Sequence, residues 1–188
     1  MIAIESFKKF RAEDVIAILI FACIWWVLSF IFNKFLGSQF SYIFSLLLAT
    51  TLMSFVVHLV RKAGSATLFY LISGFLTYNI NNFGAIGLDK IIIFLIAGLI
   101  FELFFIIFKL EFKNVQFDIV IATSFSSMSI PVSIGFLISF GTAVHLLGAT
   151  INLMILSFLI GLIGSIISFL IWSYLRRTKL ILMYEYMP

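Results

Sequence analysis

One acidic residue lies inside a long apolar stretch, where a charge is costly. Glu102 falls within residues 91–108, eleven positions after Ile91, which is about 16 Å along an α-helix. If that stretch crosses a bilayer, the carboxylate lies near the middle, at a cost of a few kcal/mol. We expect Glu102 to face an internal cavity and to bind a cationic or amine-bearing ligand, or a proton. The alternative is a protonated Glu102, or one that is hydrogen-bonded to a Ser or Asn of a neighbouring helix.

A serine-rich segment around Pro131 offers a second polar region. Residues 123–133 read Thr-Ser-Phe-Ser-Ser-Met-Ser-Ile-Pro-Val-Ser, and the proline removes one backbone donor from a helix. Freed carbonyls and several hydroxyls suit a small polar ligand, and we expect Ser127 to contact one. The alternative is a simple kink in which the serines bond back to their own helix.

Polar side chains gather where the apolar run 67–80 ends. Asn79, Asn81 and Asn82 follow one another closely there, and Tyr78 adjoins them. Amides beside an aromatic ring can hold a heterocycle, so we expect Tyr78, Asn79 and Asn82 to contribute to a substrate site. The same residues are also typical of any helix end in water.

Two further residues are candidates for contact with a small ligand. Trp25 lies ten residues into the first apolar run, too deep for the interfacial aromatic belt, so it either stacks on a ligand ring or packs as a buried indole. His145 falls where the fifth run turns into the sixth. It either contacts a ligand at the mouth of the bundle or is a solvated or capping residue.

Small residues recur every four positions in the last apolar run, at Ser157, Gly161 and Ser165. Such stripes let helix backbones approach closely in membranes. The stripe is either internal packing or a docking face for another membrane subunit. The sequence does not separate the two, and these three residues are the candidate partner interface.

Several catalytic and metal-binding patterns are missing from the sequence. It has no P-loop, no H-E-x-x-H, no G-x-S-x-G and no Cys–His cluster,. Cys23 is the one cysteine, so no disulfide can form within the chain. We therefore expect no enzyme, no catalytic residue, no metal and no cofactor.

The composition indicates a membrane protein. Of the 188 residues, 63% are hydrophobic and 11% are charged, whereas soluble domains are roughly half apolar and a quarter charged. The apolar runs are too long for barrel strands, so helices must span the bilayer. We predict an all-α polytopic membrane protein, a single domain over residues 1–188 that forms a bundle of six transmembrane helices. The expected spans are residues 15–32, 41–60, 67–80, 91–108, 119–140 and 146–175.

The positions of Lys and Arg predict the orientation. Of 12 such residues, ten precede the first span, follow the second or fourth, or lie in the C-terminal tail. Lys34 and Lys90 alone fall on the opposite side. By the positive-inside rule, both termini lie in the cytoplasm and the chain lies in the cell membrane. The net charge of +4 is thus explained by contact with membrane lipid, without nucleic acid.

This plan resembles the S components of energy-coupling factor (ECF) vitamin transporters, and especially the hydroxymethylpyrimidine/thiamine type. Residues 61–66, Arg-Lys-Ala-Gly-Ser-Ala, resemble the basic pair and small-residue turn before the third helix of that family. Glu102, followed after six mostly apolar residues by Lys109, resembles its fourth helix. Residues 161–164, Gly-Leu-Ile-Gly, resemble its small-residue last helix. One departure is the docking motif of the first helix, where alanines 12, 17 and 22 are spaced by five instead of four.

The resemblance implies a subunit that captures a substrate. Such a protein binds a micronutrient in the outer half of the bundle and works with a transmembrane coupling subunit and two cytoplasmic ATPases. Glu102 would then face thiamine, its aminopyrimidine half or another amine-bearing ring. Two other functions stay open: a stand-alone secondary transporter or channel that uses Glu102 as an ion or proton site, and a membrane scaffold protein.

Overall fold

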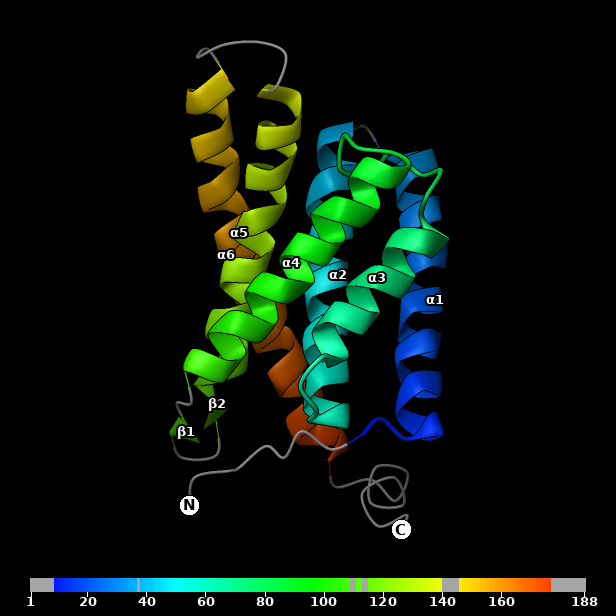
Figure 1. The fold of residues 1–188 in the computed structure, drawn as a ribbon, viewed down its shortest axis with the longest axis vertical. Coiled ribbons are helices and arrows are strands. Elements are labelled where there is room, and N and C mark those ends of the chain that lie inside the picture. The colour runs from blue at the N-terminus through cyan, green and yellow to red at the C-terminus, as the bar shows by residue number, and fades with distance from the viewer. Residues whose placement is uncertain (1–8, 37, 109–110, 113–114, 140–145, 177–188) are drawn as a thin grey trace.

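The computed structural model is a bundle of helices that describes residues 9–36, 38–108, 111–112, 115–139 and 146–176 (Figure 1). The described residues form six helices and one small hairpin of two antiparallel strands. The predicted all-helical membrane bundle is therefore confirmed. The elements are α1 (Ala12–Phe35), α2 (Ser38–Val60), α3 (Ser65–Leu76), α4 (Leu88–Ile107), β1 (Glu111–Phe112), β2 (Val115–Gln116), α5 (Phe117–Ser139) and α6 (Leu146–Leu175).

Five of these helices are long and apolar enough to cross a membrane, namely α1, α2, α4, α5 and α6. The sixth, α3, has 12 residues, about 18 Å of helix, whereas a bilayer core needs about 30 Å. The prediction of a third span over residues 67–80 is therefore corrected to a shorter helix. The residues that follow α3, 77–87, are non-helical and are called here the α3–α4 segment. Gly84 and Gly87 in that segment have φ of 78° and 71°, values that break a right-handed helix.

The elements divide between the two ends of the bundle (Figure 1). One end carries the α3–α4 segment. The other end, called here the hairpin end, carries β1 and β2, the start of α1 and the end of α6. The chain thus begins and ends its described course at the same end, because each helix runs opposite to the one before it.

Close packing of small residues holds the core of the bundle. α5 packs against α4 and α6, and α6 also packs against α2. A Cβ added at Gly161 would lie 2.1 Å from Ser127 Oγ, and one added at Gly164 would lie 2.3 Å from Thr50 Oγ1. These contacts leave room for glycine alone, as is common where membrane helices approach closely.

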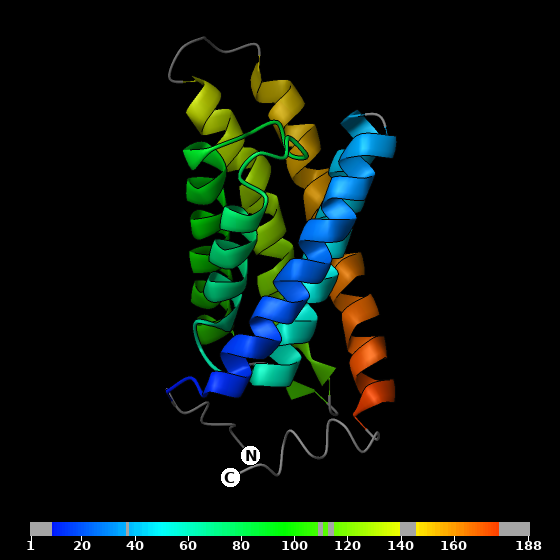
Figure 2. The ribbon, with the colours of Figure 1, turned by 90° about the vertical axis from the view of Figure 1, so that its right-hand side faces the viewer.

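α1 lies at the edge of the bundle, where it packs mainly against α2 and α3 (Figure 2). Only 22% of its most apolar stretch is buried inside the protein. The remaining surface is apolar, with Ile16, Ile20, Val27 and Phe30 all about half exposed. This is the surface expected of a helix that faces lipid.

α5 continues through Pro131 without interruption. The hydroxyls of Thr123, Ser124 and Ser129 bond to carbonyls three or four residues earlier in the same helix. Local hydroxyls and neighbouring helices can satisfy the backbone around a membrane proline, which lets the helix carry on.

Candidate functional site

Glu102 lies towards the hairpin end of α4 and bonds to α3. The helix begins at Leu88, so Glu102 is 14 residues in, about 21 Å from the start, and only five residues before its last residue, Ile107. Its Oε1 accepts a hydrogen bond of 3.2 Å from the backbone N–H of Ala66, in the first turn of α3. The N-cap residue of α3 is Gly64, which has no side chain to cap with. Glu102 therefore serves as a cap supplied by another helix.

Further polar oxygens lie buried near this cap. Glu102 Oε2, Ser65 Oγ and Thr67 Oγ1 have no hydrogen-bond partner among the residues that the structure describes. Thr67 packs directly on α4, since a Cβ on Gly98 would lie 2.7 Å from Thr67 Cα. The α3–α4 contact at the hairpin end is thus tight and has unused acceptors.

The most elaborate polar arrangement lies at the other end, around Lys90 in the first turn of α4. Lys90 is completely buried. Its ammonium donates hydrogen bonds to Thr77 O at 3.0 Å, Ile80 O at 2.8 Å and Asn82 Oδ1 at 2.6 Å. All three acceptors belong to the α3–α4 segment, so one side chain fixes the course of that segment. Non-helical backbone at membrane depth needs such internal partners.

Three aromatic rings surround the same ammonium: Trp25 of α1, Phe83 of the α3–α4 segment and Phe94 of α4, called here the aromatic box. Lys90 Nζ lies 5.9 Å from the ring centroid of Trp25 and 5.8 Å from those of Phe83 and Phe94, within the range of cation–π attraction. The Trp25 indole N–H donates to Ser45 O at 3.2 Å. The box thus has fixed walls on α1 and α4 and a third wall on a non-helical segment.

Phe83 lies among the other rings in the way that a flat ligand could. Its ring stacks on Trp25, with centroids 6.3 Å apart and planes 12° apart. It meets Phe94 edge-on at 5.6 Å and Tyr42 edge-on at 5.7 Å. Stacking on one ring and edge contact with two others are favourable aromatic geometries.

The seven residues predicted to bind a substrate do not all come together. Trp25 and Asn82 are both buried and come together around Lys90. Tyr78 and Asn79 lie in the same segment but are exposed, and Tyr78 O accepts the N–H of Gly87 at 2.9 Å. His145 lies outside the described residues. Glu102 and Ser127 do not join this cluster, because both bond elsewhere.

Ser127 connects two helices of this chain. Its hydroxyl reaches Ser124 O and Ser157 O, both at 2.8 Å. The residues of the small-residue stripe are likewise turned inward. Ser157 and Ser165 are completely buried, Ser157 Oγ shares a hydrogen bond of 2.7 Å with Tyr42 Oη, and Gly161 packs on Ser127. The stripe is therefore internal packing, and its prediction as a partner interface is corrected.

Sequence reasoning missed Lys90 and His58. From the sequence, Lys90 was interpreted only as a marker of membrane orientation and His58 only as an interfacial residue. In the structure His58 is buried at the hairpin end, where Nδ1 lies 3.0 Å from Gln116 Oε1 and the ring stacks on Trp172 at 6.1 Å. The signal for Lys90 was available: a lysine in an apolar helix directly after a stretch rich in Asn and Gly.

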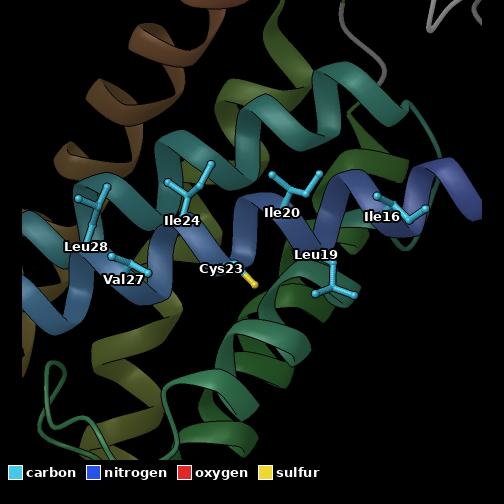
Figure 3. A pocket seen from close by; sticks show the side chains of 7 residues that line it. All are labelled: Ile16, Leu19, Ile20, Cys23, Ile24, Val27 and Leu28. Carbon is cyan, nitrogen blue, oxygen red and sulfur yellow. The ribbon is translucent and has the colours of Figure 1, made fainter.

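A shallow groove of about 630 Å³ runs along α1. Figure 3 shows its lining side chains on this one helix. All are apolar apart from the thiol of Cys23, and none offers the charged or amide group that would orient a polar solute. They are Ile16, Leu19, Ile20, Cys23, Ile24, Val27 and Leu28.

The part of the chain that the structure describes contains no group of three or more His, Cys, Asp or Glu side chains placed to hold a metal ion. Comparison with protein-family models, with curated proteins and with solved structures finds no match to this chain. The protein is thus a helical membrane protein whose function has to be argued from its own side chains.

Proposed function

We propose that this protein captures a small planar solute at the α3–α4 end of the bundle, as the substrate-binding subunit of an ATP-driven importer of the ECF type. The observation that carries the proposal is the stacking of Phe83 on Trp25, at 6.3 Å and 12°, inside a buried aromatic box. Phe83, the wall of the box that a solute would replace, belongs to a non-helical segment. Three hydrogen bonds from Lys90 hold this segment, so its displacement would require those bonds to break but would not require a helix to unfold.

The walls that Phe83 would leave behind are suited to a flat ring. Trp25 and Phe94 belong to α1 and α4, and Tyr42 belongs to α2, so they keep their places if the α3–α4 segment moves. Ring faces and edges bind heteroaromatic solutes through dispersion and quadrupole interactions. Such pockets, with mostly apolar walls and a few convergent polar groups, are typical small-molecule sites.

The remainder of the proposal comes from the sequence. It lacks an ATP-binding loop,, so active import would need other chains: a transmembrane coupling subunit and two cytoplasmic ATPases. The excess of basic residues on the hairpin side supports cytoplasmic termini in the cell membrane, with the α3–α4 end outside.

The position of Glu102 changes the expected substrate. An amine-bearing ring was expected because a free intramembrane carboxylate would pair with it, but Glu102 caps α3. The charged group beside the aromatic box is instead the ammonium of Lys90. Thiamine and aminopyrimidines therefore remain probes suggested by family resemblance, without a carboxylate to bind them at this end.

Tryptophan fluorescence tests the proposal directly, because two adjacent tryptophans give a matched pair. Trp25 is completely buried in the box, whereas Trp26 is 40% exposed. The protein in lipid nanodiscs would be titrated with planar solutes: thiamine, thiamine monophosphate, nicotinamide and nicotinate. We expect saturable quenching by at least one of them, retained in Trp26→Phe and lost in Trp25→Phe. Quenching that survives Trp25→Phe, or no response to any solute, would contradict capture in the box.

A second function is favoured by the unused acceptors near Glu102. A secondary transporter could bind a proton or Na⁺ at Glu102 Oε2, Ser65 Oγ and Thr67 Oγ1, which have no partner among the described residues. It would then move solute in liposomes that contain this chain alone, driven by an ion gradient, and Glu102→Gln would stop the flux. Flux that requires ATPase subunits would rule this function out.

A further inference from the structure

The charge of Lys90 has no counter-charge in the part of the chain that the structure describes. Its three hydrogen-bond acceptors, two carbonyls and an amide oxygen, are all neutral. The ion pair Lys62–Asp14 lies at the opposite end of the bundle and does not involve Lys90. Asp89 is adjacent in sequence but is exposed and does not pair with Lys90. The ammonium is thus solvated by dipoles and rings, while its net charge stays uncompensated.

A second donor lies beside it without a partner. Asn82 is 3% exposed, and its Oδ1 accepts from Lys90. Its Nδ2 is buried and has no hydrogen-bond partner within the described part of the chain. A buried amide donor that is left unpaired is costly, and in native proteins it usually marks a missing acceptor.

The start of α4 adds a third positive element. Its N-cap residue, Gly87, makes no side-chain cap, so the first-turn N–H groups receive no acceptor from that side chain. A helix N-terminus carries a partial positive charge that favours anions. Lys90 lies in this same first turn, so the helix end and the ammonium act on the same small region.

The cation position of the site is already filled. Carbonyl oxygens and ring faces suit an ammonium group, and Lys90 provides it. An incoming amine would have to displace Lys90 and share the box with its charge. An incoming anion would instead neutralise that charge, and its oxygens would accept charge-assisted hydrogen bonds.

We infer that Lys90 and Asn82 bind an anionic group, a carboxylate or a phosphate, carried by the planar solute that stacks on Trp25. This inference rests on the proposed function and deepens it, because it names the charge of the substrate. The solute would lay its ring where Phe83 now lies and direct its acidic group to Lys90 Nζ and Asn82 Nδ2.

Two pairs of probes separate the charge of the solute from its ring. Nicotinate and nicotinamide share one ring, and thiamine monophosphate and thiamine share another, but only the first of each pair carries an acidic group. With the wild-type chain in nanodiscs, we expect the acidic member of at least one pair to bind tenfold or more tightly. Lys90→Met should remove that preference without favouring the neutral or cationic member.

Asn82→Asp supplies the missing charge from within the chain. The new carboxylate would pair with Lys90, so we expect Tm without solute to rise by about 3 °C or more and the preference for acidic probes to disappear. Asn79→Asp is the matched control, because Asn79 is exposed in the same segment. It should leave both Tm and the preference unchanged.

The outcomes distinguish the two proposals. If thiamine or nicotinamide quenches Trp25 as well as its acidic partner does, solute capture stands and the anion site is wrong. If Asn82→Asp lowers Tm and keeps the preference for acidic probes, Lys90 only holds the α3–α4 segment in place, and the anion site is again wrong. If no probe binds, solute capture itself is contradicted.

Discussion

The carboxylate of Glu102 and the backbone N–H of Ala66 join α4 to the first turn of α3, at 3.2 Å. The bond supplies from a distant part of the chain what Gly64 cannot supply at the N-cap. An intramembrane acid that looks functional in sequence thus has a structural partner.

Removal of that carboxylate should destabilise the protein. Loss of an N-cap acceptor costs about 1 kcal/mol, so we expect Glu102→Ala to lower Tm by about 2–4 °C. Glu102→Gln keeps an acceptor oxygen, so its Tm should fall less than that of Glu102→Ala. The measurement is thermal unfolding in nanodiscs, together with solute quenching of Trp25. If Glu102→Gln abolished quenching at unchanged Tm, Glu102 would be a ligand-binding residue and not a cap.

Gly161→Ala should be strongly destabilising. The new Cβ would lie 2.1 Å from Ser127 Oγ and 3.0 Å from Ser124 Cα, and overpacking of this kind costs about 1–3 kcal/mol. Ser127→Ala in the same chain should recover part of the loss, because it removes the hydroxyl but leaves the Ser124 backbone in place. Ile163→Ala, at a half-exposed position of the same helix, is the control and should have a smaller effect on Tm.

His58 and Gln116 should show a measurable coupling. Their hydrogen bond of 3.0 Å ties α2 to β2, and a buried bond contributes about 1 kcal/mol. His58→Phe keeps a ring against Trp172 but removes the bond, and Gln116→Leu removes the same bond from the other side. In a double-mutant cycle of unfolding free energies, the two losses should not add. Additive losses would show that the bond contributes nothing.

The proposed orientation can be checked with one cysteine at each end. In a Cys23→Ser background, we expect Asp89→Cys to react with a membrane-impermeant maleimide in intact cells. Glu13→Cys should react only after permeabilisation. Both positions are exposed, so access differs only by the side of the membrane. The reverse pattern would place the α3–α4 segment in the cytoplasm and contradict capture from outside.

The helices were predictable from sequence because each needs only a long apolar run. The predicted bounds of five spans lie within about three residues of α1, α2, α4, α5 and α6. The third helix ends at Leu76, before the end of the predicted run 67–80, and the residues that follow it are non-helical. Apolar content alone does not reveal where a helix ends. The run 67–80 was the shortest of the six predicted spans, and this was the only sign in the sequence that its helix would be short.

The site was less predictable because its bonds join residues far apart in sequence. Trp25 and Asn82 were recognised as candidates, but nothing in the sequence says that Lys90 lies between them. The sequence does not show that Glu102 caps α3, since a cap supplied across two helices leaves no local pattern. The stripe around Gly161 fits both internal and external packing until its neighbours are known.

The α3–α4 segment carries both the ring of Phe83 and the three oxygens that hold Lys90. Ring and oxygens therefore belong to one mechanical unit. Displacement of Phe83 and loss of the oxygens around Lys90 would therefore be coupled, and the segment would have to close again over a bound solute to bring Asn82 Nδ2 back beside its acidic group. In the open form of the box, water would have to solvate the ammonium of Lys90.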